Sequence, residues 1–129
     1  MADAQGDIFR TDGLIVEEVD SKQNVAITKG EVVVFDTDGY RICAAADAAG
    51  TKAYMATSTV TATAATRKKV EIVRQGYCRV YKIGDGQYIG DTPTFDDNGG
   101  VKTGGNAIGN MVCAEETDNA AVYQGVFIG

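Results

Sequence analysis

The chain has 129 residues, which is the size of one ordinary domain and enough to bury a substantial core. Its 44% hydrophobic and 23% charged residues are typical of a folded globular protein rather than a disordered one. Histidine is absent. The sequence therefore excludes Ser-His-Asp and Cys-His catalytic systems, imidazole metal ligands and histidine pH switches.

The charge balance argues against nucleic acid as a partner. Twelve basic and eighteen acidic residues leave a net charge of −6, and phosphate backbones repel an acidic chain unless its cations gather in a patch. The basic run at residues 67–69 is typical of a solvated turn before a hydrophobic strand. The chain has no apolar run long enough for a bilayer, and its acidic first residues lack a secretory pattern. We expect a protein made in the cytoplasm, without a membrane or nucleic acid partner.

The first part of the chain differs in composition from the rest. Residues 1–13 contain few large apolar side chains, chiefly Ile8 and Phe9, together with three aspartates. This composition predicts a flexible, extended N-terminal arm outside the core. From Leu14 onward short apolar runs alternate with polar turns. We therefore expect a single β domain over residues 14–129.

Short strands with turn signals between them dominate this domain. The sequence Asp-Thr-Asp-Gly at residues 36–39 predicts a tight turn and hence a hairpin, because aspartate caps locally and glycine tolerates positive φ. Alternating apolar and charged residues on both sides of Gly76 predict two strands, each with one solvated face. The succession predicts an all-β fold, a β-barrel or a sandwich, with strands at residues 14–16, 25–27, 31–35, 40–44, 70–74, 78–83, 111–114 and 120–128.

Three segments do not follow this pattern. Residues 44–50 are rich in alanine and form the best helical candidate, although they are too few for a helix without packing. Residues 56–64 alternate threonine with small residues, which predicts an extended strand or arm that approaches another backbone or subunit closely. Residues 90–106 hold five glycines and the single proline, so we expect the longest irregular region there.

The three cysteines are the first candidates for chemistry. Cys43, Cys78 and Cys113 each lie in a strand-like stretch, and an odd number of them argues against a disulfide framework. They lack the close Cys-x-x-Cys pair that a thiolate metal site usually needs. We expect three buried thiols that act as small hydrophobic residues, and no bound metal.

Two other motifs and the acidic side chains give no catalytic signal. Residues 99–103 resemble part of a phosphate-binding loop, but valine precedes the lysine and no long helix follows. Residues 36–39 resemble the start of a calcium loop, but the glycine comes two positions early. The acidic residues that might pair as in a glycosidase fall in turns and loops. We expect no enzyme, no catalytic residue and no cofactor.

A succession of landmarks resembles a known family. Gly30-Glu-Val-Val-Val34 precedes an alanine-rich segment that ends at Gly50. Val73-Arg-Gln-Gly-Tyr77, Ile89-Gly-Asp91 and Ile108-Gly-Asn-Met-Val112 follow in order before the last apolar strand. Over residues 25–129 this succession resembles the small capsid decoration, or cement, proteins of tailed bacteriophages. Members of that family were formerly labelled predicted recombinases, a label for which this chain has no phosphate-binding loop.

The resemblance implies a β body with an N-terminal arm, on the outer surface of an expanded phage head. It implies the major capsid protein as partner and a homotrimer at three-fold positions. On this hypothesis the arm docks on the capsid and the body associates with its copies. The expected capsid contacts are Ile8, Phe9 and Leu14, and the expected subunit contacts are Thr57, Thr59, Thr61 and Thr63. Two alternatives stay open, namely another virion subunit such as a tail-tube protein, and a carbohydrate-binding β module.

Overall fold

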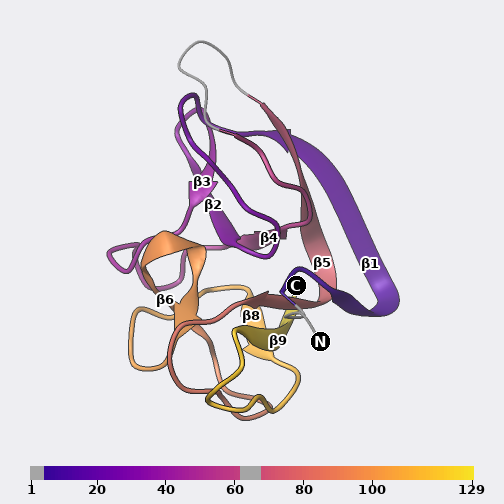
Figure 1. Ribbon diagram of the computed structural model, residues 1–129, viewed down its shortest axis with the longest axis vertical. Coiled ribbons are helices and arrows are strands. Elements are labelled where there is room, and N and C mark those ends of the chain that lie inside the picture. Colours follow the sequence, from indigo (N-terminus) through magenta and orange to yellow (C-terminus); the bar gives the residue numbers. More distant parts are fainter. Residues whose placement is uncertain (1–4, 62–67) are drawn as a thin grey trace.

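The structure is a computed structural model that describes residues 5–61 and 68–129. The described chain is almost entirely β, which confirms the predicted all-β class (Figure 1). It contains one short 3-10 turn, Asp97–Gly99, and no helix long and apolar enough to cross a membrane. The strands are β1 (Ile8–Asp20), β2 (Val32–Asp36), β3 (Gly39–Ile42), β4 (Tyr54–Ala56), β5 (Lys69–Tyr81), β6 (Thr94–Phe95), β7 (Val101–Lys102), β8 (Met111–Cys113) and β9 (Tyr123–Ile128).

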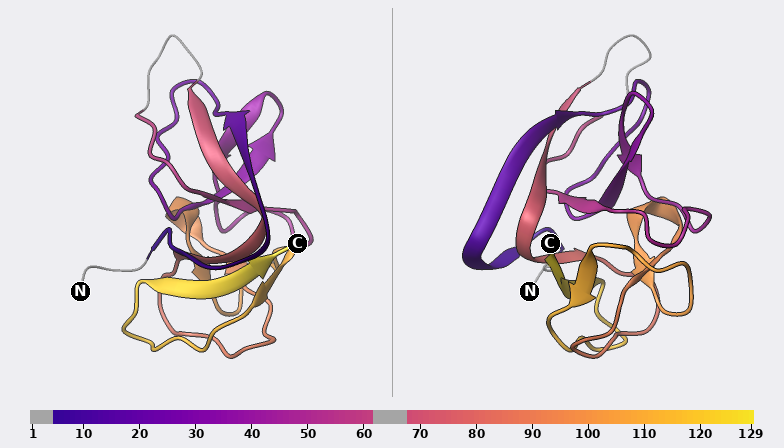
Figure 2. Two further views of the ribbon diagram at one scale, coloured as in Figure 1. Left: turned by 90° about the vertical axis from the view of Figure 1, so that its right-hand side faces the viewer. Right: turned by 180° about the vertical axis from the view of Figure 1, so that it is seen from behind.

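Seven of these strands form one antiparallel sheet. Its order is β3-β2-β4-β5-β9-β8, and β1 pairs with β5 on the side opposite β4 and β9. After β1, Ser21 forms a single bridge with Tyr40 of β3, so the sheet curls back on itself without closing into a barrel (Figure 2). β6 and β7 form a separate small hairpin.

The sheet is organised around β5, a single strand where the sequence predicts two. Gly76 does not interrupt the strand, because its φ of 144° lets the backbone bend while pairing continues on both sides. Val73 and Cys78 are five positions apart, so strict alternation would place them on opposite faces, yet both belong to one core cluster. A side chain at position 76 would also meet Leu14, at 2.9 Å from its Cδ1.

The core consists of two clusters on the two faces of the curled sheet. In β2 the neighbouring residues Val32 and Val33 point to different clusters, as strand alternation requires. The cluster that contains Val33 is built by residues of β2, β3, β4 and β5, with Val19 of β1 packed against it. The cluster that contains Val32 is built by residues of β2, β4, β5, β8, β9 and the β6–β7 hairpin. Phe95 of β6 is the largest fully buried side chain, so this hairpin is part of the core.

The hairpin expected around residues 36–39 is confirmed. β2 and β3 pair around the turn at residues 36–39, where Thr37 adopts a φ of 60°. β8 and β9, the last two strands, also pair.

Two other expectations were wrong. Residues 25–27 form only a bridge between Ile27 and Val60, and residues 90–106 hold β6 and β7. β6 and β7 form because Phe95 is buried in the core, and the local composition of residues 90–106 does not reveal that contact.

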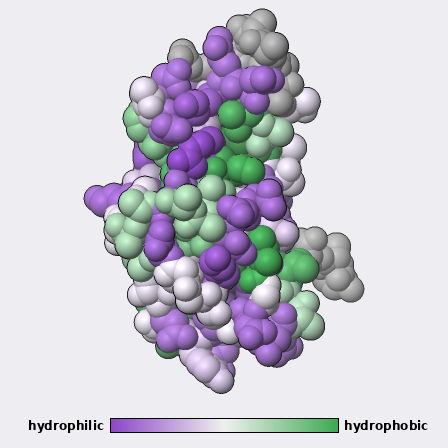
Figure 3. All heavy atoms as spheres, turned by 90° about the vertical axis from the view of Figure 1, so that its left-hand side faces the viewer, coloured by the Kyte–Doolittle hydropathy of each residue, from purple (hydrophilic) through white to green (hydrophobic). Residues whose placement is uncertain are grey.

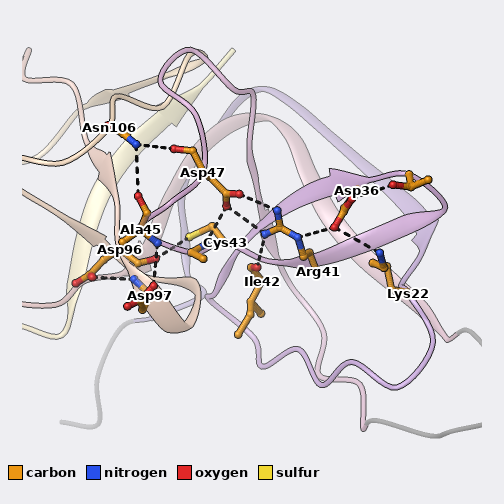
Figure 4. A network of polar contacts seen from close by, with 12 residues as sticks. Lys22, Asp36, Arg41, Ile42, Cys43, Ala45, Asp47, Asp96, Asp97 and Asn106 are labelled. Carbon is orange, nitrogen blue, oxygen red and sulfur yellow. Dashed lines mark hydrogen bonds and ion pairs between the residues drawn. The ribbon is translucent and has the colours of Figure 1, made fainter.

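The expected helix at residues 44–50 is also wrong, because turns occupy this segment. The Asp47 carboxylate accepts a hydrogen bond from the Ala44 amide (2.9 Å), a local bond that competes with a helix. Arg41 then fixes Asp47 through two bonds, of 2.7 and 3.2 Å, and donates a third to Asp36 (Figure 4). Asp97 and Asn106 also bond to the segment, so side-chain contacts rather than helix propensity determine its turns.

The boundary expected at residue 13 differs from the structure. β1 begins at Ile8 and continues past it, and Ile8 pairs with Cys78 and packs against the core. The Arg79 amide donates to the Asp7 carbonyl (2.8 Å), so the ladder extends even further toward the N-terminus. Polar composition predicts an arm, but pairing with a distant strand satisfies the same backbone groups.

The Arg41 network predicts a loss of stability in acid. Its hydrogen bonds, with those of Thr37 and Lys22, lower the pKa of Asp36 from 3.8 to about 2. Burial acts to raise the pKa of Asp47, but the bonds from Arg41 and Ala44 leave it lowered. Because both folded-state values lie below the unfolded ones, the stabilisation is complete above about pH 4 and is lost as the pH falls toward about 2.

Urea unfolding of the wild type and of Arg41→Gln at about pH 6 and about pH 2.5 measures this effect. We expect the wild type to be the more stable protein at the higher pH, and the difference to shrink in acid. Equal losses of stability in the two proteins would show that these carboxylates are not linked to folding through Arg41.

Candidate protein-docking surface

β1 is the outermost strand of the sheet. It lies at the side of the molecule, and the views from front and behind show nothing beyond it (Figures 1 and 2). Within the described residues, its outer edge is met by another strand only at its end, where the Lys22 amide donates to the Tyr40 carbonyl (2.9 Å). A free strand edge presents unpaired backbone groups, which a strand from another chain can satisfy.

The hydrogen-bond register tells which backbone groups face outward. The Ser21 amide donates to the Lys68 carbonyl (2.8 Å), so Ser21 faces β5. Because directions alternate along a strand, Glu17 also faces β5, whereas Val16 and Glu18 direct their N–H and C=O groups to the free edge. The hydrogen bonds of β5 are consistent with this register. The carbonyl of Glu71, the partner of Glu18, accepts a bond from the Thr57 amide (2.8 Å) on the β4 side, away from β1.

The side chains along this edge combine apolar and acidic groups. Ile15 is 51% exposed and Val16 is 38% exposed, which is high for large apolar residues in a strand. All three acidic residues at positions 17, 18 and 20 are exposed. Glu17 binds Arg74 and Asp20 binds Lys69 (2.6 Å), whereas Glu18 forms no ion pair with the described residues. The side of the molecule opposite β1, seen in Figure 3, carries hydrophobic residues across its middle between hydrophilic regions. β1 therefore offers both unpaired backbone and exposed apolar surface.

The three expected capsid contacts lie on β1 but differ in exposure. Ile8 and Leu14 pack against the core, so they are structural residues rather than free anchors. Phe9 is half-buried, with its ring edge-on to that of Tyr77 at 5.9 Å and with Arg79 over its face at 5.3 Å. The exposed apolar residues are the adjacent Ile15 and Val16, which composition alone did not single out.

The expected threonine strand is not formed by the described part of its segment. β4 ends at Ala56, and bends follow. The Thr57 hydroxyl donates to the Glu71 carboxylate (2.7 Å), and the Thr59 hydroxyl accepts from the Lys29 amide (3.1 Å). Thr61 is exposed, and Thr63 lies outside the described residues. Thr57 and Thr59 thus satisfy groups of their own chain.

A second surface feature is a pocket of about 510 Å³ between two loops, residues 86–88 and 116–119. Beside it Tyr88 and Ile89 are 70% and 64% exposed. Hydrogen bonds hold their turn: the Tyr88 amide donates to the Asp91 carboxylate (3.1 Å), and the Cys113 amide donates to the Asp91 carbonyl (2.8 Å). Gly86 is required here, since a Cβ would lie 1.7 Å from the Thr117 carbonyl oxygen.

The thiols are free and buried, as expected. Burial raises the pKa of the Cys43 thiol to about 12 and that of Cys113 to about 12, and it also raises the pKa of Cys78. Cys113 donates to the buried Gln87 side chain (2.9 Å). Within the described residues, histidine, cysteine and acidic side chains form no cluster that could hold a metal ion.

Comparison with known proteins adds no identification. No protein-family model matches the chain, and neither a curated protein nor a solved structure matches it. The resemblance to phage decoration proteins therefore stays a prediction from the sequence.

The raised thiol pKa values predict slow chemistry at all three cysteines. A thiolate is the reactive form, and both burial and protonation oppose it here. We expect no rapid reaction of the native protein with Ellman's reagent at about pH 8, and three titratable thiols after unfolding in urea. Rapid labelling of a cysteine in the native protein would reveal an exposed, activated thiol.

Proposed function

We propose that this chain is a structural protein of a tailed-phage virion, which decorates the outer surface of the expanded capsid. It bridges neighbouring major capsid subunits and stabilises the shell, and its copies assemble as homotrimers. The unpaired edge of β1 is the observation that supports this proposal best, because it can add to a strand or extended segment of another protein. The succession of turns and strands noted in the sequence points to the same family.

We place the proposed contact on a strand edge rather than on an arm. Residues 8–13 are part of β1, so the groups available for docking are the outward amides and carbonyls of Val16 and Glu18 and the nearby apolar side chains. A few backbone bonds give modest affinity at each site. Many copies on one shell add these contributions, and a protein that binds only the expanded lattice stabilises that lattice.

Co-sedimentation with heads of the phage that encodes the chain tests this function. We expect saturable binding to expanded heads and none to unexpanded heads. Val16→Pro should weaken binding about tenfold, since it removes one outward N–H without taking a hydrogen bond from the β1–β5 ladder. Val16→Ala, which keeps that N–H, is the matched control, and urea unfolding establishes that both variants are folded.

Equal binding of Val16→Pro and Val16→Ala would show that the β1 edge does not dock on the capsid. Failure of the wild type to bind any heads would overturn decoration itself, and tubes formed by the protein alone would then favour a tail-tube subunit.

Carbohydrate binding is a second candidate, favoured by the pocket beside Tyr88. An exposed aromatic ring on a hydrogen-bonded turn provides an apolar face for a sugar, and Glu116, Asp118 and Asn119 line the same pocket with polar groups. A site of this kind uses stacking for affinity and hydrogen bonds for orientation. The two functions are compatible, since the pocket and β1 lie on different elements.

A glycan array with the purified protein tests this candidate. We expect Tyr88→Phe to retain the binding of any glycan recognised by the wild type, because the ring remains. Tyr88→Ala should weaken it about tenfold or more. Absence of glycan binding by the wild type, or equal binding by the wild type and Tyr88→Ala, would contradict the hypothesis that this pocket recognises carbohydrate.

A further inference from the structure

Two glutamates face each other at the free edge of the sheet. Glu18 of β1 is the direct partner of Glu71 of β5. Their backbone groups point away from each other, Glu71 toward Thr57 and Glu18 toward the outer edge, so this is a non-hydrogen-bonded pair. In such pairs the side chains approach most closely, and like charges placed directly opposite are destabilising.

Neighbouring groups of the described chain balance the charge of this pair only in part. The nearest cation on the same two strands, Lys69, lies two pairs further along, where it binds Asp20 at 2.6 Å and also interacts with the charge of Glu18. Glu71 accepts one hydrogen bond from the Thr57 hydroxyl, and both glutamates are exposed. In the described residues no ion pair involves Glu18 or Glu71. The sheet thus keeps two adjacent carboxylates at the position where its backbone is open.

We propose that Glu18 and Glu71 receive an arginine or lysine side chain from an extended segment that adds to β1. A residue of the added strand opposite Glu18 has its side chain on the same face as both glutamates, in one row across the three strands. An arginine there can bond to a carboxylate with two parallel N–H groups. Val16 shares this face two positions away, so the partner carries an apolar residue two positions from the basic one.

The same charges argue against a second copy of this chain as the occupant. Pairing of β1 with another β1 brings together two strands that each carry four acidic residues, Asp12, Glu17, Glu18 and Asp20, and one basic residue, Arg10. Charged edges of this kind prevent association between copies. A basic segment of another protein is attracted by the groups that repel a copy.

An NMR titration with a designed peptide tests this partner chemistry directly. The inference rests on the docking role proposed for β1, but this experiment needs no phage heads, so the two can fail separately. The probe is the capped peptide Thr-Val-Thr-Arg-Thr-Val-Thr, which offers the basic and apolar residues in either chain direction. We expect it to shift the backbone amide signals of Val16 and Glu18, whereas the same peptide with glutamate for arginine should leave them unchanged.

Two variants distinguish the contribution of the glutamate charges to peptide binding from that of the backbone groups of β1. Glu18→Gln and Glu71→Gln should each weaken peptide binding at least about threefold at low salt, and the difference should shrink at high salt. Glu71→Gln keeps the acceptor for Thr57 and relieves the repulsion, so it should also raise the urea midpoint of the free protein. A residue with a merely structural role would not move stability and binding in opposite directions.

Three results would overturn the proposal. These are an unchanged spectrum with the arginine peptide, equal shifts with the arginine and glutamate peptides, and binding that the two glutamine variants leave unaltered. Binding of the wild type to expanded heads together with any of these results would keep decoration and reject only the basic partner.

Discussion

The pairing of β5 along both of its edges is the constraint on which the rest of the structure depends. β1 occupies one edge, and β4 and then β9 occupy the other. The strand supplies Val70 and Ile72 to one core cluster and Val73, Cys78 and Val80 to the other. Alternation along the strand serves both clusters, and the bend at Gly76 brings Val73 and Cys78 into the same one, so the two halves of the sheet share one strand.

This arrangement accounts for the exposed position of β1. A strand that pairs with the doubly anchored β5 is held firmly on one side, so its other side can stay open without loss of the fold. Ile8 and Leu14 fix its first half against the core, and the bridge at Ser21 fixes its end. Between them Val16 and Glu18 keep backbone groups for a partner. The open edge is thus preorganised, which lowers the entropy cost of binding an extended segment.

What the sequence predicts well here is local. The all-β class follows from alternation and turn residues, the β2–β3 hairpin follows from the turn at residues 36–39, and the buried thiols follow from their strand-like surroundings. The errors at Ile8 and Phe95 come from contacts between distant residues, whereas the missed turns at residues 44–50 come from side-chain bonds within the same segment and its flank. Ile8 pairs with Cys78 in the sheet, and Phe95 is buried in the core, while Asp47 bonds to the nearby Arg41. The facing of Glu18 and Glu71 depends on the register of two distant strands, and no local pattern encodes it.

The opposed glutamates are best understood through the balance between stability and association. A like-charge pair costs only a fraction of a kcal/mol in an exposed sheet, a small part of the stability of a domain of this size. At an open edge the same charges discourage pairing between copies, which is the main hazard of a free strand. A partner with a basic side chain is attracted by the two glutamates, whereas a second acidic copy of β1 is repelled by them. The repulsion between Glu18 and Glu71 in the free protein therefore makes the β1 edge selective for a basic partner over a second copy. On a capsid with many such sites, a modest preference at each site adds up to stable attachment of the protein.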